Sequence, residues 1–260
     1  MWQRRLSGWC VVCSVLAIGL LSAPAASGQT LTVVPTALTS VEGNSSSSSL
    51  FQTGAATLQV YYSEAFLNSA GIVPGVLIDG VAYRRNTGGA TGPAGSTSFS
   101  TYDIRLSESF AAPASITTTF ANNIVGAQTL VRTGSLTFAA NSFPGGATPN
   151  GFGPVVEFDT PYLYAGGSLL IEFRRGARTG DTTALNTDTD NTVATQAGAR
   201  WVFNTGSDTA LTGTIVNGGH VLQLSYVAIP EPSSMALLGL AGVASWCALQ
   251  KRRRTRKKAA

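Results

Sequence analysis

Residues 169–174 read Leu-Leu-Ile-Glu-Phe-Arg, and their pattern decides the fold class. Apolar side chains recur at every second position up to Phe173, while Glu172 and Arg174 occupy the opposite face. Successive side chains of a β-strand point to opposite sides of the sheet, so this period of two predicts a strand with one buried face. Its polar face is expected to be solvated, as in an antiparallel sheet, with Glu172 and Arg174 as a surface ion pair.

The same alternation recurs along the middle of the chain and is punctuated by glycine-rich loops. No window keeps a helical period beyond one or two turns, and the short segments 63–69 and 117–123 are the expected helical pieces. The pair Asp79-Gly80 interrupts one apolar run and predicts a tight turn or a bulge. We therefore expect an all-β, jelly-roll-like antiparallel β-sandwich over residues 29–229. Its strands include residues 57–61, 102–106, 130–138, 154–158, 199–204 and 222–226.

Composition agrees with one folded domain, because the chain has 260 residues that are 44% hydrophobic and only 12% charged. Such a composition argues against a disordered polyelectrolyte and against a coiled coil.

Residues 1–28 have the three parts of a secretory signal peptide. Two arginines are followed by an uncharged apolar run at residues 9–21 and then by small residues up to Gly28. A helix of this run is too short to cross a bilayer comfortably. We expect export through the Sec translocon and cleavage after Gly28, or alternatively after Ala25; an uncleaved anchor is the competing interpretation.

Residues 230–260 form a second three-part segment that begins with Pro230, Glu231 and Pro232. The following run at 233–250 carries no charge, and about 18 helical residues span roughly 27 Å, which suffices for a thin bilayer. A basic cluster then predicts a transmembrane helix with a cytoplasmic tail by the positive-inside rule. The cluster consists of Lys251, Arg252, Arg253, Arg254, Arg256, Lys257 and Lys258.

This order of Pro-Glu-Pro, apolar span and basic tail resembles the PEP-CTERM sorting signal of Gram-negative bacteria. The resemblance covers residues 229–258, with Ile229 where that family often has valine. It implies an inner-membrane-anchored precursor that the membrane-embedded cysteine protease exosortase recognises and cuts. Prolines on both sides of Glu231 keep that segment extended, as a protease substrate must be. An ordinary tail anchor without processing is the alternative.

The region ahead of this signal resembles, more loosely, a domain that often precedes PEP-CTERM signals. The resemblance spans residues 58–226 and rests on segments 77–84, 119–123, 158–164 and 169–174. It implies a secreted β-sandwich and carries no particular biochemical activity.

Charge is unevenly distributed, although the net value is +4. Nine of the 17 lysines and arginines lie at positions 4, 5 and 251–258, and between these two ends lie eight cationic residues, all arginine, and all 13 acidic residues. An acidic middle region disfavours nucleic acid as a partner.

The three cysteines, Cys10, Cys13 and Cys247, also lie in the terminal segments. A disulfide framework and a thiolate site are therefore excluded from the domain.

The oxygen-rich segment 181–192 is the candidate for a cation site. Asp188, Asp190 and Asn191 carry the ligand types that Ca²⁺ prefers. The segment lacks the turn glycine and distal glutamate of an EF-hand loop. We expect a solvent-exposed loop, with calcium binding as the functional alternative, and no other metal or cofactor.

The candidate residues for sugar binding are Tyr162, Tyr164 and Trp201, whose rings could stack on a carbohydrate. Packing in the core or at a strand edge is the preferred interpretation, because aromatic residues are common in strands.

Catalytic candidates are sparse. His220 is the only histidine, which excludes a multi-histidine metal site, and we expect a polar residue at a strand edge. Glu157 and Asp159 are two residues apart on one predicted strand, and a carboxylate pair at about 7 Å could act in glycoside hydrolysis. Their alternation with Val156 and Phe158 instead predicts a solvated sheet face.

The sequence thus indicates a non-catalytic exported protein of the cell surface or extracellular matrix, sorted by exosortase and linked to exopolysaccharide. The alternative is a carbohydrate-binding module on the same sandwich. A third hypothesis is a secreted glycoside hydrolase that uses Glu157 and Asp159.

Overall fold

The computed structural model describes residues 28–86, 91–110, 112–183 and 185–229. The expected signal peptide up to residue 27 and the Pro-Glu-Pro motif, apolar helix and basic cluster of 230–260 lie outside the described residues. No helix within the described ranges is long and apolar enough to span a membrane. Gln29–Ala228 form one compact unit.

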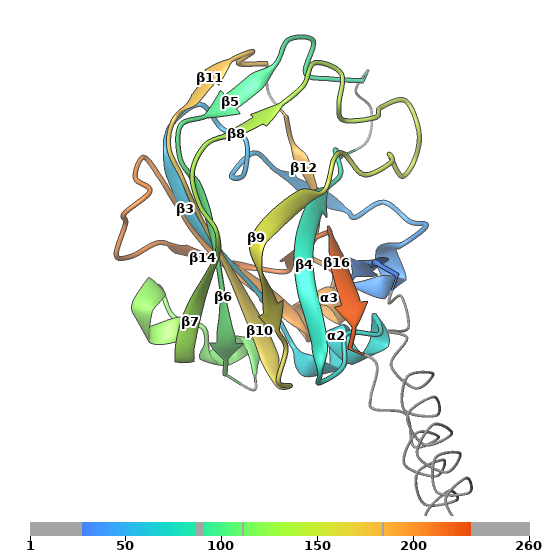
Figure 1. The fold of residues 1–260 in the computed structure, drawn as a ribbon, viewed down its shortest axis with the longest axis vertical. Helices are drawn as coiled ribbons and strands as arrows, with labels where there is room; N and C mark the ends of the chain where they lie inside the picture. Colours follow the sequence, from blue (N-terminus) through green and yellow to red (C-terminus); the bar gives the residue numbers. More distant parts are fainter. Residues whose placement is uncertain (1–27, 87–90, 111, 184, 230–260) are drawn as a thin grey trace, which may run out of the picture. The chain divides into compact units, whose positions relative to one another are not determined.

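Two antiparallel sheets face each other across the core, as the sequence predicts (Figure 1). The four-stranded sheet has the order β1-β16-β4-β9, and the six-stranded sheet has the order β14-β13-β3-β10-β6-β7. The strands of the first are β1 (Thr30–Val34), β4 (Val76–Tyr83), β9 (Val156–Leu163) and β16 (Leu222–Ala228). Those of the second are β3 (Ala56–Tyr62), β6 (Tyr102–Ser109), β7 (Val125–Arg132), β10 (Ser168–Arg175), β13 (Ala199–Thr205) and β14 (Thr214–Asn217).

The long strands pair in a nested order along the chain: β1 with β16, β3 with β10, β4 with β9, and β6 with β7. Folding such a nested ribbon across two sheets produces a jelly roll, which confirms the predicted fold class. The strands β13 and β14 extend the second sheet beyond β3.

Two small three-stranded sheets complete the sandwich. One contains β5, β8 and β11 and is labelled at the top of Figure 1; the other contains β2, β12 and β15. Their bounds are β2 (Ser45–Ser47), β5 (Thr97–Phe99), β8 (Leu136–Phe138), β11 (Arg178–Gly180), β12 (Thr187–Asp190) and β15 (Gly219–His220). The helical turns are η1 (Thr36–Leu38), α2 (Glu64–Ser69), η2 (Pro113–Ser115), η3 (Phe120–Asn123) and α3 (Val193–Gln196).

Local signals explain several of these elements. Helix α2 begins where Ser63 caps it, because the Ser63 hydroxyl accepts a hydrogen bond from the Phe66 N–H at 3.4 Å. The expected helix at 117–123 is a shorter 3₁₀ turn, η3. The Asp79-Gly80 pair forms a bulge in β4, where the register with β9 shifts between Ile78 and Gly80.

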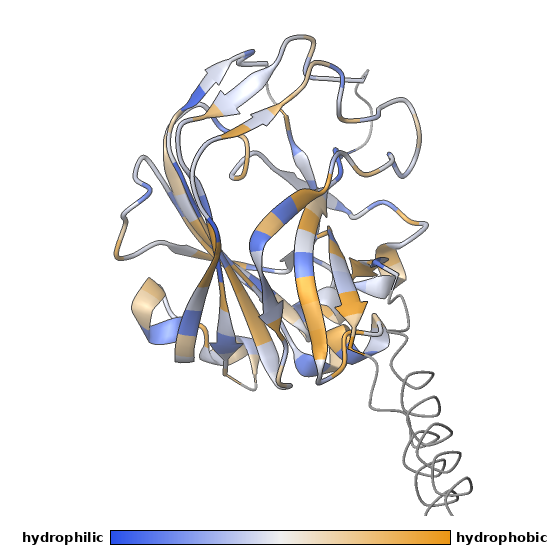
Figure 2. Cartoon of the chain, viewed as in Figure 1, coloured by the Kyte–Doolittle hydropathy of each residue, from blue (hydrophilic) through white to orange (hydrophobic). Residues whose placement is uncertain are grey.

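The core is rich in aromatic rings where the large sheets meet the β5-β8-β11 sheet. Phe51 lies at their centre, with its ring centroid 5.6 Å from Tyr83, 5.4 Å from Phe138 and 5.3 Å from Phe143. Edge-to-face and tilted contacts of this kind add to the apolar area that the rings bury. Figure 2 shows the apolar colouring along β4, β16 and β10, the strands that line this core.

The outer face of the six-stranded sheet is covered at Glu172, which corrects the expected surface position of this residue. The Glu172 side chain is only 1% exposed. Its Oε1 accepts a hydrogen bond from Arg174 Nε at 2.6 Å, so the predicted ion pair exists but is largely buried. Gln59 Nε2 donates to Glu172 Oε2 at 2.7 Å and to the Phe120 carbonyl of η3 at 3.0 Å. The η3 turn therefore lies over the polar row of this sheet.

Candidate functional site

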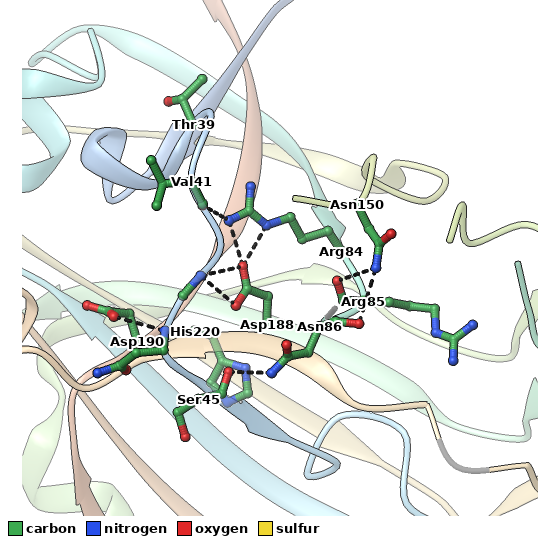
Figure 3. Close-up of polar contacts among 12 residues, drawn as sticks. Thr39, Val41, Ser45, Arg84, Arg85, Asn86, Asn150, Asp188, Asp190 and His220 are labelled. Atoms are coloured by element: carbon green, nitrogen blue, oxygen red, sulfur yellow. Dashed lines mark hydrogen bonds and ion pairs between the residues drawn. The ribbon is translucent and has the colours of Figure 1, made fainter. Parts of the chain in front are cut away.

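Part of segment 181–192, which was expected to be a solvent-exposed loop, is instead a buried strand. Thr187–Asp190 form β12, and all four residues are buried between β2 and β15. Of the three candidate ligands, only Asn191, which follows the strand, is exposed. The expectation was wrong because the side chains of β12 meet donors from distant parts of the chain (Figure 3).

Asp188 forms a buried ion pair with Arg84, the residue that follows β4. Arg84 Nε and Nη2 lie 2.7 and 2.6 Å from Asp188 Oδ2, and both side chains are at most 1% exposed. The N–H of Gly43 donates to both Asp188 oxygens at 3.1 and 3.3 Å. Burial raises the pKa of Asp188 to about 6, and the Arg84 charge opposes that rise. Arg84 was not a sequence candidate, because nothing local marks the partner of a carboxylate 104 residues away.

Asp190 binds the start of α3. Its Oδ2 accepts hydrogen bonds from the hydroxyls of Thr192, at 2.6 Å, and Thr195, and its Oδ1 accepts the Asn44 N–H at 3.2 Å. Burial acts to raise the pKa of Asp190, but these hydrogen bonds outweigh it, so the pKa is lowered. The carboxylate thus acts as a local cap for protein donors.

These contacts bear on the calcium hypothesis for Asp188, Asp190 and Asn191. Both carboxylates face N–H, O–H or guanidinium donors, which a cation would have to displace. Across the described ranges no cluster of three or more histidine, cysteine or acidic residues could hold a metal ion. Calcium binding therefore stays a prediction that the local donor set does not support.

His220 is fully buried, which corrects its expected place at a polar strand edge. Its Nε2 lies 3.4 Å from the Ser49 hydroxyl and its Nδ1 lies 3.3 Å from the Thr187 hydroxyl. The Trp201 ring packs edge-on against the imidazole, with 4.7 Å between centroids. Burial lowers the pKa of His220 to about 3, so the ring is neutral at physiological pH. In a catalytic triad a carboxylate faces Nδ1 of the histidine, whereas here the Thr187 hydroxyl occupies that position.

The predicted sugar-stacking residues do not form an exposed platform. Tyr164 is 1% exposed and its hydroxyl donates to the Gly167 carbonyl. Trp201 is 7% exposed and packs against Phe203 and His220. Tyr162 on β9 is half-buried. Packing inside the sandwich, the preferred interpretation, therefore describes Tyr164 and Trp201, and their rings offer no free face to a carbohydrate.

Glu157 and Asp159 lie on the edge strand β9 and are both exposed, while Val156 and Phe158, which alternate with them, are buried. This pattern confirms the predicted solvated face. Gln29 Nε2 lies 3.5 Å from Glu157 Oε2, and the Thr133 N–H donates to Asp159 Oδ2 at 2.9 Å. The two carboxylates thus make separate contacts with neighbouring segments.

The C-terminal end of the fold is well defined. Strand β16 pairs with β4 from Leu222 to Ala228 and with β1 from Leu222 to Tyr226. The next residue, Ile229, is 48% exposed. The last ladder hydrogen bonds of the sandwich are thus made before the Pro-Glu-Pro segment begins.

Comparison with known proteins identifies this junction. Residues 228–254 match the PEP-CTERM protein-sorting motif, as the resemblance implied. A search of the curated proteins found no match. The motif implies export, a membrane-anchored precursor and processing by exosortase. The chain therefore carries, from the last residue of its final strand onward, the PEP-CTERM protein-sorting motif of an exported, exosortase-sorted protein.

Proposed function

We propose that this chain is a non-catalytic component of the bacterial cell surface or extracellular matrix and associates with exopolysaccharide. The observation that carries the proposal is the coincidence of two boundaries. The compact unit ends at Ala228, and the sorting motif begins at the same residue. Cutting near Glu231 would therefore release the whole sandwich and remove no part of it.

Maturation would occur in two steps in this proposal. The Sec translocon exports the chain, and the signal peptide at residues 1–28 is removed. The apolar helix at 233–250 and the basic cluster then hold the precursor in the inner membrane until exosortase acts. The released domain would contain eight arginines, no lysine and 12 acidic residues, so the positive charge of the precursor would be left behind.

A structural rather than catalytic role is supported by how the chemically capable side chains are used. Asp188, Asp190 and His220 are buried and hydrogen-bonded within the fold. The carbohydrate-binding alternative loses its basis at Tyr164 and Trp201, whose rings are buried. The jelly roll also occurs in lectins, but a shared fold does not by itself assign a ligand.

Mass spectrometry of the protein from a bacterium that carries exosortase tests the sorting part of the proposal. The surface or matrix form should end close to Glu231 and yield no peptide containing Trp246. In a matched strain without exosortase, peptides containing Trp246 should be present and the protein should remain in the membrane fraction. Peptides containing Trp246 in the surface form would contradict the proposal.

The matrix part is tested separately in a strain that cannot make exopolysaccharide. We expect the processed domain to shift from the matrix fraction to the medium, with unchanged termini. Unchanged retention at the cell surface would contradict the association with exopolysaccharide but leave the sorting step intact.

A further inference from the structure

Two buried arginines, Arg175 and Arg178, lie where β10 passes into β11. Arg175 is 1% exposed and Arg178 is 5% exposed. Ion pairs in the described part of the chain are made by other arginines, such as Arg84, Arg105 and Arg174, and none is made by Arg175 or Arg178. The two guanidinium groups are therefore buried without a carboxylate partner.

Neutral carbonyls hold part of each guanidinium. Arg175 Nη1 donates to the Gly54 carbonyl at 2.7 Å, and its Nη2 donates to the Ser49 carbonyl at 2.8 Å. Arg178 Nη2 donates to the Thr183 carbonyl at 3.0 Å. The Arg175 guanidinium also lies 5.2 Å from the centre of the Phe99 ring. These contacts orient the side chains but supply no negative charge.

Three nitrogen atoms of the pair remain without a hydrogen-bond partner although they are buried: Nε of Arg175, and Nε and Nη1 of Arg178. Burying an unpaired donor costs free energy, and burying an unpaired charge costs more. Arg84 is equally buried but has Asp188 at 2.6 Å. A buried arginine is thus paired with a carboxylate at Arg84 but not at Arg175 or Arg178.

The surroundings relieve the charge only in part. Burial lowers the pKa of Arg175 to about 10; Tyr102 opposes this fall and the neighbouring Arg178 adds to it. Asp181 is close enough to raise the pKa of Arg178, which burial lowers. The oxygens of Asp181, however, already accept the N–H groups of Gly95 and Thr183, each at 2.7 Å. One carboxylate offsets at most one of the two positive charges, so a net positive charge remains beside the unpartnered nitrogens.

We propose that Arg175 and Arg178 together bind a small inorganic anion, such as chloride, sulfate or phosphate. Planar guanidinium groups are suited to anions because they present several donors in fixed directions. A water molecule could accept from these nitrogens but would not offset their charge. A polymer is too large to reach side chains that are 1% and 5% exposed.

Thermal unfolding of the full-length chain in detergent tests this site. Sodium salts of chloride, sulfate and phosphate are titrated against gluconate at constant ionic strength. At a hundredfold excess over the dissociation constant, a bound anion should raise the unfolding temperature by roughly 5–10 °C, and the rise should saturate. Unchanged unfolding temperatures with every inorganic anion would overturn the proposal. So would a response to acetate or glucuronate that exceeds the inorganic response, because the occupant would then be an organic carboxylate.

The variant Arg178→Met separates a bound anion from a general salt effect. It removes one charge and keeps an unbranched apolar stem in place of the inner part of the arginine side chain, so the anion-dependent rise should be lost. In gluconate it should unfold at or above the wild-type temperature, because an uncompensated buried charge is gone. The control Arg84→Met removes an equally buried arginine and should lower stability while keeping the anion response. An anion response that Arg178→Met retains in full would overturn the proposal.

A crystal of the wild-type chain grown in bromide provides a readout that does not depend on how any variant folds. We expect an anomalous peak within hydrogen-bond distance of the unpartnered nitrogens of Arg175 or Arg178. Ordered water without an anomalous peak would show that these donors are hydrated and would overturn the assignment.

Discussion

Arg84 donates from both Nε and Nη2 to a single carboxylate oxygen, Oδ2 of Asp188, at 2.7 and 2.6 Å. The two residues are 104 positions apart, and their backbones are also bonded, since the Asp188 N–H donates to the Arg84 carbonyl at 3.0 Å. The pair therefore joins the end of β4, in a large sheet, to β12, in a small one.

Removing one member of this pair should be costly. Arg84→Met leaves the Asp188 carboxylate buried without its cation, and breaking a buried pair in this way costs about 3–5 kcal/mol. Urea denaturation gives the free energy of unfolding. The control Glu157→Gln changes an exposed carboxylate and should stay within about 0.5 kcal/mol of wild type.

The double variant Arg84→Met with Asp188→Leu completes the test. It removes both charges, so it should recover a large part of the stability that Arg84→Met loses. Independent, additive losses in the two single variants would show that the pair is not the unit that stabilises this junction.

Gly43 should tolerate no side chain, because it lies against the same carboxylate. A Cβ at Gly43 would stand 2.3 Å from the Thr189 carbonyl oxygen and 2.6 Å from Asp188 Oδ1. Gly43→Ala must therefore shift backbone or break the Gly43–Asp188 hydrogen bonds, at a cost of about 1–3 kcal/mol. In Gly54→Ala the added Cβ meets nothing within 4 Å, so this matched control should be close to neutral. Equal unfolding midpoints for both variants would contradict the packing around Asp188.

The strands could be predicted from the sequence because their signal is local. Alternation at Ile171 and Phe173 requires only that one side of a strand faces a core, and both residues do lie in the core. Nested pairing is harder to predict, since β1 and β16 meet from opposite ends of the chain.

The candidate site could not be predicted because its contacts, like the nested strand pairing, join residues that are far apart in the sequence. Polar residues such as 187–190 are expected in a solvent-exposed loop when no hydrogen-bond donor is known to contact them. In the folded protein, Arg84 and Gly43, which are distant in the sequence, supply such donors. Likewise, Trp201 lies on a predicted strand, but the sequence does not show which face of that strand points inward. The register with β3 decides this. Local periodicity shows which side chains alternate along a strand, whereas the pairing between strands decides which face of the strand is buried.

Truncation at the junction should separate the fold from its sorting signal. A chain that ends at Ile229 keeps all of β16 and should have the free energy of unfolding of the longer protein. A chain that ends at Gln223 loses β16 from Leu224 onward, including the buried Leu224 that pairs with both β1 and β4, and should not fold stably. Circular dichroism and urea denaturation of the two truncated chains make the comparison. A loss of stability at Ile229 would mean that residues beyond the last strand support the sandwich.

His220 should make the protein acid-sensitive, and the chain offers a clean test because it has one histidine. Burial lowers the pKa of His220 to about 3, whereas an unfolded histidine titrates near 6.5. Below about pH 6.5 the unfolded chain therefore binds the proton more readily, and stability should fall by about 1.4 kcal/mol per pH unit down to about pH 3. Asp188, with its raised pKa, acts in the opposite direction between about pH 4 and 6, so the quantity to measure is the difference between wild type and His220→Gln. That difference in unfolding free energy should shrink steadily as the pH falls, because the variant has no imidazole to protonate. Parallel profiles would mean that the imidazole of the folded protein reaches solvent and is not enclosed by Trp201, Ser49 and Thr187.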